Sequence, residues 1–171
     1  MNVSFELIIP PVILGILTIM ILNMNRVIIT SSTENRITYE LQNRVNLTLD
    51  ILEYELRPAK SDEMTISADS TRLTFVTIND DTVSITRDER EMIITKTSLA
   101  GITEQQEYPV KLSSLVFYRE LSTPFLLNVR VISRSELEEE AGTNENQARY
   151  AAIAEKEFYI RNPHFLNNIG G

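Results

Sequence analysis

The first thirty residues form an apolar block that is almost free of charge. Every residue from Leu7 to Asn25 is uncharged, and most of them are Leu, Ile, Val or Met. As a helix rising about 1.5 Å per residue, this stretch would cover roughly 28 Å, close to the ~30 Å hydrocarbon core of a bilayer. The pattern predicts a transmembrane helix within residues 1–30.

A removed signal peptide is the alternative interpretation of this block. Such a peptide needs a basic start and a small-residue cleavage site. The segment Met1–Glu6 contains no base, and the apolar run continues through Val27, Ile28 and Ile29 into helical sequence. We therefore expect the helix to be retained.

Two prolines and two small residues mark this helix. Pro10 and Pro11 remove backbone donors, so regular helix is expected to start at or kink around Pro11. Gly15 and Thr18 lie about one turn apart and would permit close approach of another helix. The alternative is an ordinary membrane anchor with an N-terminal proline cap.

The helical period continues beyond the apolar block, over residues 31–57. One apolar stripe recurs at intervals of three or four residues, with polar residues on the other faces. Its members are Ile37, Leu41, Val45, Leu49, Leu52 and Leu56. Pro58 should end the helix, because the residue before a proline is pushed out of helical geometry. We expect this amphipathic continuation to pack on the sheet of its own domain.

From residue 58 to residue 171 the pattern changes to short runs with a period of two, rich in Ile, Val, Thr and Phe. The expected strands are 64–66, 73–78, 82–87, 91–97, 110–120, 126–133 and 157–161. Asn79–Asp81 and Asp88–Arg90 read as turns, and 135–148 as a polar loop. The predicted fold class is α+β, with a long N-terminal transmembrane and amphipathic helix packed on an antiparallel β-sheet domain.

Composition narrows the possible functions. The 171 residues carry a formal net charge of −8 with no basic cluster, which disfavours nucleic acid as a partner. There is no cysteine, the single histidine is His164, and no glycine-rich phosphate loop appears. Asn79–Asp81 and Glu138–Glu140 could offer oxygens to a cation, but a turn and a solvated face explain them better. We expect no catalytic residue, metal, cofactor or small-molecule substrate, and no enzymatic activity.

Several short motifs together resemble the type IV pilin superfamily, including its minor pilins and the pseudopilins of type II secretion. The start Phe5–Ile9, followed by Val12–Leu17, resembles the pilin N-terminus and its apolar helix. Leu52–Ala59 is similar to the segment that closes the helix in the larger members. Leu73–Phe75 and Leu112–Tyr118 resemble core strands, and Glu157–Asn162 resembles a closing strand.

The resemblance implies a non-enzymatic structural subunit of a bacterial envelope or filament assembly. Its partners would be the membrane and other copies of itself or related pilin-like subunits, with the assembly helix carried by Phe5, Glu6, Pro10, Pro11, Gly15 and Thr18. Family members usually place a glutamate fifth in the mature chain, whereas counting from Phe5 gives Ile9 there and Glu6 second. We hypothesise that Glu6 pairs with an amine, Lys or Arg of a neighbouring subunit, the alternative being a carboxylate in the headgroup layer.

The membrane topology and the function each have an alternative interpretation. Arg26, Arg36 and Arg44 follow the apolar block and favour a cytoplasmic C-terminal domain, whereas the pilin resemblance implies an extracytoplasmic one; we follow the resemblance. The rival function is a single-pass accessory subunit of another membrane complex with an extracytoplasmic β-rich domain. A third possibility, an anchored sensing domain, would need a pocket that the sequence does not reveal.

Overall fold

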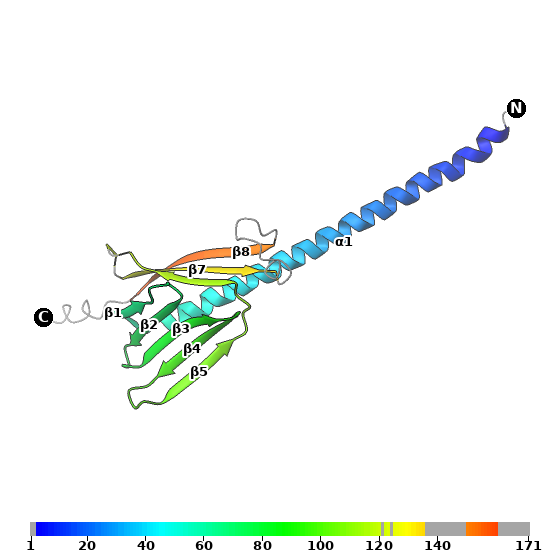
Figure 1. Cartoon of the computed structure of the whole chain (residues 1–171). Coiled ribbons are helices and arrows are strands. Elements are labelled where there is room, and N and C mark those ends of the chain that lie inside the picture. The colour runs from blue at the N-terminus through cyan, green and yellow to red at the C-terminus, as the bar shows by residue number, and fades with distance from the viewer. Residues whose placement is uncertain (1–2, 121, 124, 136–149, 161–171) are drawn as a thin grey trace. The chain divides into compact units, whose positions relative to one another are not determined.

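The structure is a computed structural model that describes residues 3–120, 122–123, 125–135 and 150–160, with side chains from Pro10 onward. The chain divides into two compact units, Met1–Tyr39 and Glu40–Gly171. The first unit contains the N-terminal part of one long helix, and the second contains the end of that helix and all the strands. The protein therefore has the α+β composition that the sequence predicts (Figure 1).

Helix α1 runs from Val3 to Leu56 and contains both prolines. The helix begins eight residues before Pro11, so regular helix does not start at Pro11, and the alternative expectation of a kink around Pro11 stays a prediction. Several threonine hydroxyls along α1 donate to a carbonyl oxygen four residues earlier in the helix, as Thr33 does to Ile29 at 2.9 Å. This bond satisfies the Thr33 hydroxyl within the helix. The helix ends two residues before Pro58, as expected.

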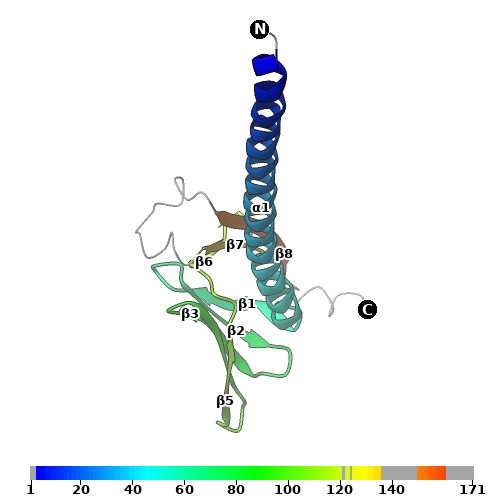
Figure 2. The same cartoon turned by 90° about the vertical axis from the view of Figure 1, so that its right-hand side faces the viewer.

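In the described residues, eight strands form two antiparallel sheets. Their bounds are β1 Ala59–Ile66, β2 Arg72–Thr77, β3 Thr82–Asp88, β4 Glu91–Thr97, β5 Thr103–Tyr108, β6 Ser114–Tyr118, β7 Leu126–Arg134 and β8 Ala151–Tyr159. The first five strands make one sheet in sequential order, and the last three make another (Figures 1 and 2). Every pairing is antiparallel, so the predicted meander is present twice.

The strands differ from the predicted ones in a few places. No strand was expected at β5, whose residues Thr103–Glu107 are exposed on both faces and so show no apolar alternation. β8 begins at Ala151 rather than Glu157, and β1 begins at Ala59 rather than Met64. β6 is shorter than expected, covering Ser114–Tyr118 only. The predicted polar loop 135–148 lies outside the described residues except for Ser135, and His164 and Glu138–Glu140 lie wholly outside them.

The core of the second unit is apolar and closely packed. Its largest fully buried side chains are Phe75, Phe117, Leu52, Leu73, Ile85, Met92, Ile94, Leu112, Leu115, Leu127, Ile132 and Ile160. They come from the end of α1, from both sheets and from the segments beside them. Complete burial of one such side chain stabilises a fold by about 1.5–3 kcal/mol, so this core holds the helix end and both sheets together.

Candidate membrane helix and the clefts of the sheet domain

The N-terminal part of α1 presents apolar side chains in every direction. All residues from Pro10 to Thr33 are exposed, including thirteen large apolar side chains between Val12 and Ile29. Their exposed fractions lie between 50% at Leu17 and 68% at Met24. The helix is long and apolar enough to cross a membrane, and none of its most apolar window is buried. A helix that is hydrophobic all round requires an apolar surrounding.

The residues predicted to mark the assembly helix are placed as follows. Pro10 and Pro11 lie within α1, and both are exposed. A Cβ added at Gly15 would meet nothing within 4 Å, so this glycine leaves open space at the helix surface. The Thr18 hydroxyl donates to the Leu14 carbonyl oxygen at 2.8 Å and is therefore satisfied within the helix. Phe5 and Glu6 lie in α1, but their side chains are outside the described part, so the pairing of Glu6 stays a prediction.

The amphipathic stripe falls in both units. Ile37 belongs to the first unit and is half-buried. The other five members lie in the second unit, where their exposed fractions are between 0% and 7%. They are Leu41, Val45, Leu49, Leu52 and Leu56. The end of α1 therefore belongs to the core of the sheet domain.

Among the residues whose side chains the structure describes, two ion pairs attach the end of α1 to the two sheets. The first joins Glu55 to Lys96 of β4, with Nζ 3.0 Å from Oε1 and 2.8 Å from Oε2. The Glu55 side chain is only 6% exposed, whereas Lys96 is 40% exposed. Burial alone would lower the pKa of Lys96, but the hydrogen bond and charge of Glu55 outweigh it and raise that pKa.

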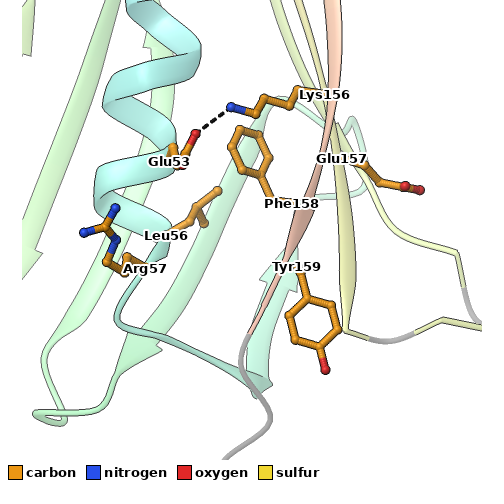
Figure 3. Close-up of a pocket in the computed structure, with 7 residues that line it drawn as sticks. All are labelled: Glu53, Leu56, Arg57, Lys156, Glu157, Phe158 and Tyr159. Atoms are coloured by element: carbon orange, nitrogen blue, oxygen red, sulfur yellow. Dashed lines mark hydrogen bonds and ion pairs between the residues drawn. The ribbon is translucent and has the colours of Figure 1, made fainter.

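The second ion pair joins Glu53 to Lys156 of β8, at 2.5 Å, and borders an open cleft of about 610 Å³ (Figure 3). Lys156 Nζ also lies 5.3 Å from the centre of the Phe158 ring, close enough for a cation–π contact. The hydrogen bond from Lys156, together with its charge, lowers the pKa of Glu53. In Figure 3 the Phe158 side chain points toward the helix and the Tyr159 side chain points away from it.

The residues that line this cleft take part in packing and salt bridging. The cleft beside Glu53 is also lined by Leu56, Arg57 and Glu157, and its acidic and basic groups already pair with one another or face solvent. In the part of the chain that the structure describes, no three His, Cys, Asp or Glu side chains gather in a way that could hold a metal ion. The proposed turn at Asn79–Asp81 is a turn in the structure, and its Asp80 carboxylate accepts from Lys60 at 2.5 Å.

Both helix–sheet ion pairs escaped sequence reasoning. Their partners are 41 and 103 residues apart in the chain, so no local spacing connects them. The one available signal was Glu55, a charged residue placed between the apolar positions Leu52 and Leu56. A carboxylate beside a buried stripe needs a cation, and this could have suggested a search for a lysine on a strand.

Comparisons with known proteins do not assign this chain to a family. No family model matches it, and searches of the curated proteins and of the solved structures found no match.

Proposed function

We propose that this chain is a non-enzymatic structural subunit that is anchored in a membrane by α1 and assembles with other subunits through that helix. In this proposal the protein is pilin-like, and its sheet domain lies outside the cytoplasm. The observation that carries the proposal is the all-round apolar surface of α1 between Val12 and Ile29, in which no residue is buried.

The difference in burial between the two ends of α1 supports the proposal that the first part of this helix is the part that anchors and assembles. Its last four turns bury their apolar stripe in the sheet domain, whereas its first turns offer apolar surface to something else. A bilayer supplies that surrounding for one copy, and neighbouring helices supply it in a filament core. Close packing of neighbouring helices is helped by small residues, and Gly15 leaves open space at the helix surface.

The motif resemblance and the element order support the pilin-like part of the proposal. A long helix that continues into an amphipathic stripe, followed by antiparallel sheets, is the arrangement that the resemblance implies. The sheet domain would then form the outer contact surface of the assembly.

Photo-cross-linking through α1 tests the proposal. A benzophenone amino acid replaces Leu17, which is half exposed in the apolar block, and in a matched control it replaces Leu47, which is equally exposed in the second unit. After irradiation of native membranes, a pilin-like assembly should give a ladder of dimers, trimers and higher multimers from the Leu17 position, and far less from Leu47.

Other patterns would overturn parts of the proposal. A single adduct to an unlike chain, identified by mass spectrometry, would establish an accessory subunit of another complex. Adducts to lipid alone would leave an anchor without an assembling helix. Recovery of the full-length chain in the soluble fraction would refute the membrane anchor itself.

A further inference from the structure

We propose that the free edge of β5 binds an extended segment of another protein by β-strand addition, and that the segment carries two basic residues three positions apart. Among the strands that the structure describes, β5 pairs with β4 alone and lies at one edge of the five-stranded sheet. In Figure 1 it lies at the margin of that sheet. This surface is separate from the helix on which the proposed function rests.

The β5 edge has no bulge, proline or lysine, and its only charged side chains are two glutamates, which would repel an acidic strand but not a basic one. Native edges are blunted by bulges, prolines, charged side chains (lysine above all) or very short strands. The opposite edge of the same sheet, β1, has both an irregular register between Ala59 and Met64 and a lysine, Lys60. In the other sheet, β6 has only five residues and β8 carries Lys156. β5 has six residues, an unbroken register with β4, and neither proline nor lysine.

The charges of β5 determine which kind of segment fits its edge. Its charged residues are Glu104 and Glu107, and both are exposed. Lys96 lies directly opposite Glu104 in β4, but its ammonium group binds Glu55. Glu104 has no ion-pair partner among the residues that the structure describes. Opposite charges that face each other on neighbouring strands stabilise the pairing, and like charges destabilise it. A strand with Lys or Arg opposite these two carboxylates therefore fits the edge.

A second copy of the chain fits less well. Antiparallel pairing of two β5 strands within one continuous sheet, centred on Gln105, would place four carboxylates on one short ladder. A basic segment neutralises the same carboxylates instead. Since Glu104 and Glu107 lie three residues apart, their side chains point to opposite faces, and the basic residues of the partner must do so as well.

Disulfide trapping on the full-length chain in detergent micelles tests this proposal, because the native chain contains no cysteine. The Gln105→Cys variant is mixed with the peptide Thr-Lys-Val-Cys-Lys-Val under a mild thiol redox buffer. In antiparallel register, the cysteine of this peptide lies opposite position 105 and its lysines lie opposite Glu107 and Glu104. The matched peptide carries Glu in place of both Lys.

The Thr65→Cys variant is the control. Thr65 is also exposed, and it lies on β1, the opposite and blunted edge of the same sheet. It belongs to the same row of paired residues across the sheet as Gln105, a row that runs through Thr74, Ser84 and Thr95. This control corrects for two effects that do not depend on β5. The peptide thiol is more reactive when lysines flank it, and the basic peptide is attracted to any part of an acidic protein. We expect the Lys peptide to be trapped at position 105 at least about fivefold more than the Glu peptide, and more than at position 65.

Charge reversal provides the second measurement. Adding Glu104→Lys and Glu107→Lys to the Gln105→Cys variant should invert the preference, so that the Glu peptide is trapped more than the Lys peptide. Equal trapping at positions 105 and 65, or a preference unchanged by the reversal, would overturn the proposal. Disulfide-linked dimers of the Gln105→Cys variant that outcompete the peptide would instead identify a second copy as the occupant.

Discussion

Both parts of α1 carry many apolar side chains, but the surroundings of these side chains are opposite. In the first unit, Leu17 is 50% exposed among neighbours that are equally exposed. In the second unit, Leu52 is fully buried, while Leu47, on another face of the same helix, is 50% exposed. In the sheet domain, one face of the helix is therefore buried and another is exposed, whereas in the first unit the helix is exposed on all faces from Pro10 to Thr33. The apolar side chains of the first unit between Val12 and Ile29 are exposed, whereas the stripe of the second unit is buried in the core of the sheet domain.

The largest expected effect comes from placing charge in the first unit. The double substitution Leu17→Arg/Ile21→Arg puts two charges one turn apart in the apolar block, and each costs about 2.5–3.5 kcal/mol at the centre of a membrane helix. We expect the variant to leave the membrane fraction, as measured by alkaline extraction and sedimentation of membranes.

The matched control carries the same charges on the exposed face of the helix in the second unit. Asn43→Arg/Leu47→Arg has the same spacing, and both positions are exposed. We expect this protein to stay in the membrane fraction. Equal behaviour of the two double variants would remove the distinction between the two parts of α1.

The next effect is smaller and concerns folding of the sheet domain. Leu52→Ala removes a fully buried side chain and leaves a cavity, which should lower the free energy of unfolding by about 2–5 kcal/mol. Leu47→Ala removes an exposed leucine from the same helix and should change it by less than about 0.5 kcal/mol. Urea unfolding in detergent, followed by tyrosine fluorescence, measures both; equal losses would contradict the burial pattern.

Much of the architecture follows from local patterns in the sequence. Pro58 ends α1, and the alternation of apolar residues in Leu73–Thr77, Val83–Ile85 and Met92–Ile94 places β2, β3 and β4 nearly where they lie. These strands have one buried face, and burial on one face imposes a period of two. The five stripe residues beyond Tyr39 were likewise readable from their helical spacing.

Other parts could not be predicted because their cause is not local. β5 is held by its pairing with β4, and its residues Glu104–Glu107 have low strand propensity. The first half of β8, Ala151–Lys156, is rich in helix-forming residues and becomes a strand through its pairing with β7. The two ion pairs at the end of α1 depend on the packing of both sheets, which the sequence pattern does not specify.

The Glu55–Lys96 pair tests how firmly the helix end is attached to the five-stranded sheet. Glu55→Gln should lower the free energy of unfolding at neutral pH by about 1–3 kcal/mol, toward the lower end because Lys96 is 40% exposed. The pKa of Lys96 is raised in the folded state, so this contribution is present below the unfolded pKa of about 10.4 and is lost as pH rises through the higher folded value.

A double-mutant cycle provides the control for this pair. Lys96→Met alone leaves the Glu55 carboxylate buried without its cation and should be at least as destabilising as Glu55→Gln. Combining the two substitutions should cost less than the sum of the single effects. Additive losses would show that the two side chains do not stabilise each other.

The smallest effect concerns Asp69 in the turn between β1 and β2, far from the helix in sequence. Its carboxylate accepts hydrogen bonds from the Ser67 hydroxyl at 2.5 Å, from the Thr71 hydroxyl at 2.7 Å and from the Thr71 amide at 3.3 Å. These bonds, that of Ser67 first, lower the pKa of Asp69 from 3.8 to about 2. The stabilisation is therefore fully present above pH 4 and is lost as pH falls through about 2.

Removing the donors one at a time should move this pKa by different amounts. Ser67→Ala removes the strongest contribution and should raise the pKa of Asp69 toward 3.8 by more than Thr71→Ala does, as measured by carboxyl NMR titration of the full-length chain in micelles. The Thr71→Ala variant keeps the backbone amide bond, which limits its effect. A pKa near 3.8 in the native chain, or a larger shift from Thr71→Ala, would contradict the turn geometry. Neither substitution should alter membrane retention, because the turn belongs to the sheet domain, which supplies its own core.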